Sequence, residues 1–300
     1  MKAHRIGFFM LLRAATLAAV LATALPASSA SDLRVIAIGG SMTEIVYALG
    51  ADKSLVATDT TSIYPPEALK LPKVGYQRQL SAEGMLSLKP TVVVATTEAG
   101  PPPVVAQLKS VGVHFAQVSA DHTFEELRNK VRVISEAVGK RAEGSRLDET
   151  LVHDWTAVQA DIARVAAART AKGQGKPKVL FLLLHSTTNG LMASGEGTAA
   201  DAVIKYAGGL NAVSGALNFK AYKPLSQEAV IAAAPDIIVL TQQGLVAIGG
   251  MDKLLAMPGL AQTPAARAKR VYAPDALFLL GFGPRLPQAV KELSQQLQAL

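Results

Sequence analysis

Two stretches of this sequence follow one plan: residues 76–96 read YQRQLSAEGMLSLKPTVVVAT, and residues 222–241 read YKPLSQEAVIAAAPDIIVLT. A leucine–serine pair, a glutamate two residues after the serine, a proline and a β-rich run recur between them at an offset of 145 residues. The serine is a favoured helix N-cap, and the apolar run after the proline is typical of a buried strand. We therefore predict two related α/β lobes, an arrangement that leaves a ligand cleft between them.

Short apolar runs predict the strands of both lobes. They are RVIAI (34–38), TVVVAT (91–96), VHFAQV (113–118), KVLFLLL (178–184), DIIVLT (236–241) and RVYA (270–273). Near-continuous apolar runs of this length are typical of parallel strands that are covered on both faces of the sheet. Because helical patterns alternate with these runs, we predict two Rossmann-like lobes with central, mostly parallel sheets.

Local signals indicate where several helices begin. Ser41 and Glu44 have the spacing of a capping box, and Thr123 and Glu126 repeat that spacing. The last helix follows GFGPR (281–285), where Pro284 suits the first turn.

A long helix is predicted in the middle of the chain. Residues 141–169 contain no proline and one glycine. Apolar residues recur there at steps of three or four, at Leu147, Leu151, Trp155, Val158, Ile162 and Val165. Such a helix would span ~44 Å at 1.5 Å per residue. We predict an N-terminal lobe at residues 31–140, a linking helix at 141–170 and a C-terminal lobe at 171–300, the lobes being joined by this one long helix.

The first thirty residues have the pattern of a secretory signal peptide. Lys2 and Arg5 precede an apolar run at residues 14–25, and small residues lead to a cleavage position near Ala30. Arg13 leaves the apolar run well short of the ~20 residues that span a bilayer. We expect export to the periplasm as a protein that does not span the membrane, and the lack of a cysteine argues against a lipid anchor.

The composition excludes several classes of function. With no cysteine, the chain has no disulfide, thiolate metal site or cysteine nucleophile. No H-E-x-x-H, G-x-S-x-G or G-x-G-x-x-G motif is present, so an exported hydrolase or metalloenzyme is a weak alternative and we expect no enzymatic activity. The net charge of +7 falls to +4 without the signal peptide. The chain has no concentrated run of Lys and Arg that would predict nucleic-acid binding.

Glu83 and Glu228 occupy the same position in the two repeated stretches. A carboxylate in the first turn of a helix complements the helix dipole, which is one sufficient explanation for both. The alternative is that each lobe presents one exposed acid on the same rim, where a two-fold related partner with basic pockets would dock.

The mature chain resembles the helical-backbone class of periplasmic binding proteins, which serve ABC importers of haem, cobalamin and siderophores. The resemblance lies in GGSMTEIVYALGA (39–51), in LSAEGMLSLKPTVVVAT (80–96) and in the two-lobed plan. It implies a monomer that delivers its cargo to a permease dimer with its ATPase. It also implies that Glu83 and Glu228 engage arginines of that permease.

Three further segments resemble the haem-binding members of the class. They are GYQR (75–78), LLLHSTTNGLMASGEGTAADA (182–202) and GFGPR (281–285). This resemblance implies that haem b is the transported ligand and that Tyr76 is the axial ligand of its ferric iron. A cobalamin or a ferric siderophore is the alternative cargo.

The chemistry of Tyr76 agrees with an iron ligand. A phenolate is a hard oxygen donor, and tyrosine is an established haem ligand. Free tyrosine ionises near pH ~10, so the iron and a nearby cation must favour the phenolate. In an extended loop Arg78 would point the same way as Tyr76 and supply that cation, or it would pair with a haem propionate. The alternative is an ordinary tyrosine half buried in a loop.

Three more residues are candidates for contact with haem. His185 ends a predicted strand, and it would be a second axial ligand, a hydrogen-bond partner or the ligand of a second haem. Tyr222 stands near the position equivalent to Tyr76, where it would line the cleft or simply pack. Arg285 would neutralise a propionate, or it would be solvated at the helix start.

Overall fold

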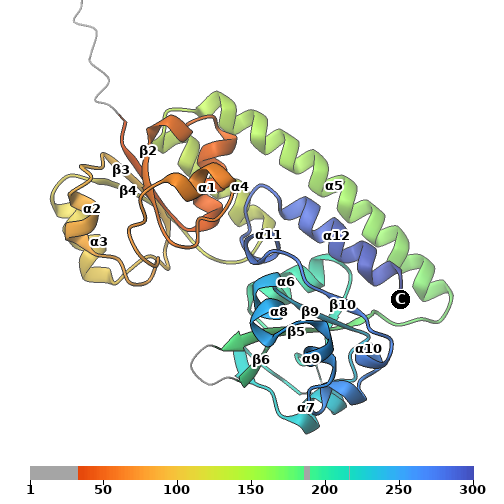
Figure 1. Cartoon of the computed structure of the whole chain (residues 1–300). Coiled ribbons are helices and arrows are strands. Elements are labelled where there is room, and N and C mark those ends of the chain that lie inside the picture. The colour runs from red at the N-terminus through yellow and green to blue at the C-terminus, as the bar shows by residue number, and fades with distance from the viewer. Residues whose placement is uncertain (1–32, 186–189, 216) are drawn as a thin grey trace, which may run out of the picture. The chain divides into compact units, whose positions relative to one another are not determined.

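The computed structural model describes residues 33–185, 190–215 and 217–300, and the predicted signal peptide lies outside these ranges (Figure 1). Within them, no helix is long and apolar enough to cross a membrane.

The first sheet is wholly parallel. In the described residues its strand order is β2-β1-β3-β4, with β1 at Val35–Ile38, β2 at Leu55–Thr58, β3 at Val92–Thr96 and β4 at His114–Val118. Its helices are α1 (Gly40–Ala48), α2 (Ala82–Leu86), α3 (Pro102–Ser110) and α4 (Phe124–Ala137), with short 3-10 turns at Asp52–Ser54 and Pro66–Lys70. The strands β1 and β3 are fully buried, as their apolar runs predict.

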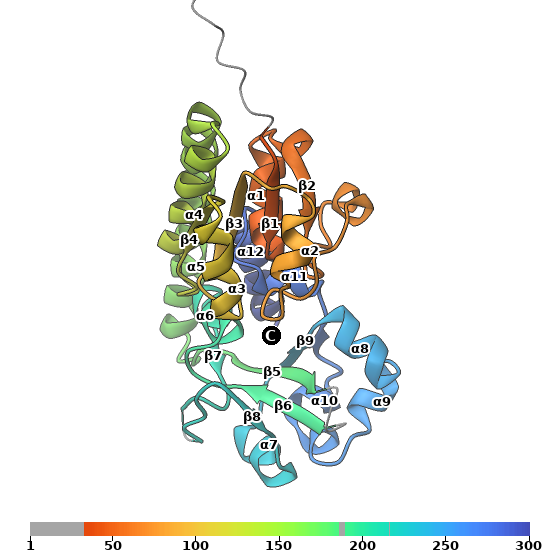
Figure 2. The same cartoon turned by 90° about the vertical axis from the view of Figure 1, so that its left-hand side faces the viewer.

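The second sheet is mixed (Figure 2). Its described strands follow the order β10-β9-β5-β6-β8, with β7 also paired to β5. The strands are β5 (Lys178–His185), β6 (Gly190–Ser194), β7 (Leu210–Asn211), β8 (Tyr222–Pro224), β9 (Ile237–Leu240) and β10 (Val271–Tyr272). Strands β6 and β8 are antiparallel to their neighbours, and the other pairs are parallel. The prediction of mostly parallel sheets is therefore confirmed, with one antiparallel side.

The remaining helices belong to the second half of the chain. They are α6 (Ala199–Tyr206), α7 (Gln227–Ala233), α8 (Gln242–Ile248), α9 (Met251–Leu255), α10 (Pro264–Arg267), α11 (Ala276–Leu280) and α12 (Leu286–Gln298), with a 3-10 turn at Leu260–Gln262. Helix α12 begins two residues after Pro284, so Pro284 precedes the helix, and Pro287 is the proline in its first turn. The prediction for Pro284 was therefore wrong, because Arg285 takes the N-cap position.

The repeat predicted from the sequence is confirmed in the elements that it spans. Ser81 caps α2 and Ser226 caps α7, and each serine hydroxyl accepts a hydrogen bond from the backbone N–H three residues later. The strand that follows, β3 or β9, pairs in parallel with β1 or β5 respectively. The two stretches therefore fold alike from the cap to the end of the strand.

The long helix α5 runs over Arg141–Ala171, as predicted. Leu151, Val158 and Ile162 of its apolar stripe are buried in one core together with residues of both sheets. Trp155 stacks on Phe124 of α4, with ring centroids 4.6 Å apart, and meets the ring of Tyr206 of α6 edge-on at 4.8 Å. Helix α5 therefore packs on helices from both halves of the chain.

The segment around α11 and α12 contacts the first half of the chain. An added Cβ at Gly40 would lie 2.4 Å from the Leu277 side chain, so the absence of a side chain there allows α11 to approach α1 closely. Helix α12 also packs along α5 (Figure 1). The lobe boundaries given above stay predictions.

Candidate ligand-binding site

A cavity of about 450 Å³ lies between the first sheet and the segments that follow β9 and β10. From the first half it is lined by Gly39, Gly40, Ser41, Thr60, Thr61, Ile63, Gln77, Thr96, Glu98, Ala120, His122, Glu126 and Lys130, and from the second by Gln243, Ala276, Leu277, Leu280 and Gly281. The wall from the second half is mostly apolar, whereas the wall from the first half carries the ionisable groups. The cavity therefore combines an apolar face with polar groups, as ligand pockets do.

The fold places this cavity at the carboxyl ends of parallel strands. Gly39 directly follows β1, Glu98 lies two residues after β3, and His122 lies four residues after β4. Loops at that edge of an α/β sheet are where ligands collect. The site therefore follows from the topology of the first sheet.

A buried carboxylate holds one wall of the cavity in place. Asp59 Oδ1 accepts hydrogen bonds from Gly39 N–H and the Ser62 hydroxyl at 3.0 and 2.7 Å, and its Oδ2 accepts from both the N–H and the hydroxyl of Thr61. Lys73 Nζ donates to the carbonyl of Ser62 at 3.0 Å. These bonds tie the loop that carries Thr60, Thr61 and Ile63 to the end of β1.

Tyr76 and Arg78 meet, but in a turn and not in an extended loop. Gln79 N–H donates to Tyr76 O at 2.7 Å and closes the turn, so the expectation of an extended loop was wrong. Arg78 Nη1 still lies 3.4 Å from Tyr76 Oη, and Arg78 Nη2 donates to Glu98 Oε1 at 2.5 Å. The bond to Glu98 raises the pKa of Arg78. Gln77 and Glu98 line the cavity, whereas Tyr76 is 38% exposed beside it.

A buried ion pair of α4 also lines the cavity. Lys130 Nζ lies 2.5 Å from Glu126 Oε1 and donates to the carbonyl of Phe282 at 3.2 Å. Burial lowers the pKa of Lys130, and the charge of Glu126 opposes that effect. The His122 ring lies 5.4 Å from the Phe282 ring. Lys130, which is paired with Glu126, and His122 thus both contact Phe282 in the second half of the chain.

The predicted capping box of Thr123 and Glu126 is confirmed in part. The Thr123 hydroxyl accepts from Glu126 N–H at 3.0 Å, which is half of a capping box. The Glu126 carboxylate, however, accepts from His122 N–H and not from Thr123 N–H. This bond fixes the backbone of His122, whose φ of +54° lies in the left-handed region.

The predicted capping box of Ser41 and Glu44 was wrong. Helix α1 starts after Gly39, which has no side chain to cap it, so Ser41 and Glu44 both lie within the helix. Glu44 is buried and accepts two hydrogen bonds of 2.8 Å from Arg285 Nε and Nη2. Burial raises the pKa of Glu44, and the bond to Arg285 opposes the rise.

Arg285 is therefore paired and not merely solvated. Its guanidinium carbon lies 3.7 Å from the centroid of the Tyr64 ring and 5.2 Å from that of Phe278. The bidentate pair with Glu44 joins α1 to the N-terminus of α12. Contact of Arg285 with a haem propionate stays a prediction.

The remaining predicted residues lie away from this cavity or outside the described residues. Tyr222 starts β8, at the edge of the second sheet, and is half buried beside Ser194 of β6. Burial raises the pKa of Tyr222. His185 ends β5, but its side chain is not among the described residues. Glu83 and Glu228 are both exposed in the first turns of α2 and α7.

Sequence reasoning missed His122, Glu98 and Lys130 as residues that line the cavity. His122 and Glu98 follow the ends of predicted strands, and the strand-end rule that selected His185 would have found them. Lys130 carries no comparable signal, because it lies within α4 and reaches the cavity through its long side chain.

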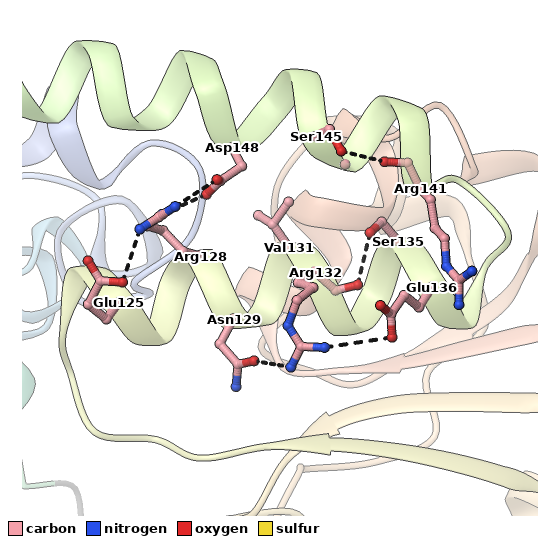
Figure 3. A pocket seen from close by; sticks show the side chains of 11 residues that line it. Glu125, Arg128, Asn129, Val131, Arg132, Ser135, Glu136, Arg141, Ser145 and Asp148 are labelled. Carbon is pink, nitrogen blue, oxygen red and sulfur yellow. Dashed lines mark hydrogen bonds and ion pairs between the residues drawn. The ribbon is translucent and has the colours of Figure 1, made fainter.

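A second cavity, of about 500 Å³, lies between α4 and α5 (Figure 3). Most of its charged side chains are paired. Arg128 Nε lies 2.8 Å from Asp148 Oδ1, and Arg128 Nη1 lies 3.2 Å from Glu125 Oε2. An added Cβ at Gly144 would lie 2.4 Å from the Ser135 hydroxyl, so the helices approach closely there. None of the residues predicted to bind ligand lines this cavity. Its side chains therefore hold the long helix on α4.

This chain is similar to a known protein family and to several binding proteins of solved structure. Residues 35–276 match the family described as periplasmic binding protein. The periplasmic heme-binding protein BhuT, solved in complex with two hemes, is 47% identical, with a TM-score of 0.81 over 89% of this chain and 98% of that one. Apo RhuT from Roseiflexus sp. RS-1 is 40% identical with the same TM-score and coverage. The periplasmic heme-binding protein HutB of Vibrio cholerae is 34% identical, with a TM-score of 0.76 over 88% of this chain and 98% of that one.

Curated relatives match at lower identity. The vitamin B12-binding protein of Vibrio cholerae is 26% identical over 88% of this chain and 89% of its own length. An uncharacterized ABC transporter substrate-binding lipoprotein of Bacillus subtilis is 25% identical over 88% of this chain and 79% of its own length. The similar proteins named here are binding proteins or transporter components.

Proposed function

This chain belongs to the periplasmic binding protein family, and from that premise we propose that it captures ferric haem b in the periplasm and delivers it to the permease of an ABC importer. It performs no covalent chemistry on its cargo.

The observation that carries this proposal is the Tyr76 hydroxyl beside the Arg78 guanidinium, at the edge of a cavity with an apolar wall. A phenolate oxygen binds ferric haem iron, and a guanidinium next to it stabilises the negative charge. The apolar side chains of Leu277 and Leu280 offer a surface for the macrocycle. The heme-binding neighbours at 34–47% identity support haem as the cargo.

Docking to the permease is proposed for Glu83 and Glu228. Both are exposed and sit in the first turns of repeat-related helices. Hydrogen bonds from its own backbone N–H and from the Ser226 hydroxyl lower the pKa of Glu228, so this carboxylate stays charged in mildly acidic surroundings. A charged acid on each half suits a permease dimer with two basic pockets.

We further propose that the protein acts as a monomer with lobes at residues 31–140 and 171–300. The signal peptide at residues 1–30 would direct export. Because α5 packs on helices from both halves, closure on the ligand is expected to be small.

Cobalamin is the second candidate cargo, because curated relatives at 25–28% identity are named vitamin B12-binding proteins. The higher identity of the heme-binding structures favours haem. A ferric siderophore is a third cargo of the same class.

The test is a titration of the purified mature protein with haemin and, in parallel, with cyanocobalamin. We expect a saturable Soret shift with haemin, no binding of cyanocobalamin, and loss of the haemin signal in Tyr76→Phe. The end point of the titration gives the stoichiometry of one or two haems. No spectral change with haemin would overturn the proposal, and saturable binding of cyanocobalamin alone would establish the second candidate.

A further inference from the structure

The geometry points to Glu98 as the residue that positions Arg78 against the Tyr76 hydroxyl. This inference rests on the proposed function, in which Tyr76 binds haem iron. Glu98 does not touch the iron in this scheme, and it acts through Arg78.

One guanidinium contacts both side chains through different nitrogens. Arg78 Nη2 donates to Glu98 Oε1 at 2.5 Å, whereas Nη1 lies 3.4 Å from Tyr76 Oη. The short bond joins two charged groups, and the long one involves a phenol at the limit of hydrogen bonding. Glu98 therefore sets the orientation of Arg78, and Tyr76 lies where the second nitrogen points.

Backbone hydrogen bonds fix the two loops to each other. Gly100 N–H donates to Gln77 O at 2.9 Å, and Leu80 N–H donates to Gly100 O at 2.9 Å. The loop that carries Glu98 is thereby tied to both sides of Arg78. This matters because the Arg78 side chain is 53% exposed, and a long exposed side chain samples many rotamers unless another group holds it.

The same geometry decides between the two roles considered for Arg78. Its Nη2 is occupied by Glu98, and Glu98 lines the cavity, so a haem propionate at this place would meet a second carboxylate. The phenolate that forms on iron binding would instead meet Nη1 alone. The charges then alternate as phenolate, guanidinium and carboxylate, which favours the iron–phenolate bond over a propionate contact.

The test is a double-mutant cycle on the full mature protein loaded with haemin. Haemin dissociation is followed by transfer to excess apomyoglobin in the wild type, Arg78→Ala, Glu98→Ala, the double variant and Glu98→Gln. Resonance Raman bands of the iron-bound phenolate are recorded for each. Loss of a group that orients a metal ligand typically costs about 10–100-fold in affinity.

We expect Arg78→Ala and Glu98→Ala each to release haemin about 10-fold faster or more, with the same shift of the phenolate bands. The double variant should match Arg78→Ala, because Glu98 acts only through that residue. Glu98→Gln should fall between the wild type and Glu98→Ala, since its amide oxygen still accepts a hydrogen bond from Arg78.

Asp161→Ala is the matched control, because it removes an exposed pair with Arg164 at 3.0 Å on α5. It should leave haemin release and the phenolate bands unchanged. Unchanged or slower release in Glu98→Ala, or an equal effect of that change when Arg78 is already absent, would overturn the inference.

The outcomes also separate this inference from the proposed function. If the wild type gives no Soret shift with haemin, both fail. If the wild type binds haemin and Tyr76→Phe does not, while Glu98→Ala behaves like the wild type, only the role of Glu98 is lost.

Discussion

The segment that carries Tyr76 and the segment that carries Tyr222 start from related sequences and end in different environments. From Ser81 and Ser226 onward they share a capped helix, an exposed glutamate and a parallel strand. Before the serine they differ: Tyr76 is the first residue of a turn and its hydroxyl lies near Arg78, whereas Tyr222 belongs to edge strand β8 and is half buried beside Ser194.

This difference teaches that the repeat preserves what both halves must do and not what one half does alone. Under the proposed docking, a two-fold related partner needs the same acid on each half, which accounts for the repeated capped helix. Under the proposed haem ligation, one axial oxygen is needed once, which leaves the residues before the serine free to diverge. Only the first segment places a cation beside its tyrosine hydroxyl, among the residues that the structure describes.

The largest expected effect is the difference in haemin affinity between the Tyr76 and Tyr222 variants. Tyr76→Phe should weaken haemin binding more than about 100-fold, because loss of the iron ligand exceeds the about 10–100-fold cost of losing an outer partner. Tyr222→Phe should change the affinity less than about threefold, since Tyr222 does not line the cavity. Spectroscopic titration measures both, and equal losses would contradict the proposed asymmetry.

The next largest effect concerns the glutamates that occur in both halves, Glu83 and Glu228. If Glu83 and Glu228 dock as proposed, Glu83→Lys and Glu228→Lys should each reduce haem uptake by cells about 10-fold or more, because a reversed charge would repel the proposed basic pockets of the permease. Haemin affinity of the purified variants should equal that of the wild type. Normal uptake by both variants would leave the two glutamates as helix-dipole residues only.

A smaller and symmetrical effect is expected at the two caps. Ser81→Ala and Ser226→Ala each remove the hydroxyl that accepts a backbone N–H, which costs about 1 kcal/mol of unfolding free energy. Denaturant unfolding monitored by circular dichroism gives the values. A loss of unfolding free energy in one serine variant and none in the other would show that the two caps are not equivalent.

The smallest effect concerns pH and is tested at Tyr222. Burial raises the pKa of Tyr222 above its ordinary value of 10, so above pH 10 the unfolded chain releases this proton before the native protein does. The native state then holds more protons, and the free energy of unfolding must fall as pH rises through that window. Urea unfolding at pH 9 and at pH 10.5 should show a larger fall in the wild type than in Tyr222→Phe. An identical fall in both proteins would contradict this assignment.

The sheets and the long helix could be predicted from the sequence because their signals are local and repetitive. The strands that end at Ile38 and Thr96 are apolar on both faces of the sheet. The apolar residues of the long helix, such as Leu151 and Val158, recur at the spacing of one helix face. The repeat could be predicted for the same reason, since its cap, helix and strand recur at one offset.

The site could be predicted only in part, because several of its contacts join residues that are distant in sequence. Glu44 has the spacing of a capping residue, yet its partner is Arg285, 241 positions later. Lys130 reaches the Phe282 carbonyl across 152 positions. No local pattern reports such pairs. The Tyr76 and Arg78 pair was found because its members are two residues apart. Glu98, which accepts a hydrogen bond from Arg78 across 20 positions, was not found.

Trp155 gives this protein a fluorescence signal of its own. It is the single tryptophan of the sequence, so the indole emission arises at one place, and its ring packs against Phe124 of α4 and Tyr206 of α6. A change in the packing of those two helices alters the polarity around the indole and therefore its emission. Repacking of α4 or α6 against α5 can thus be followed in stopped-flow experiments without attaching a dye.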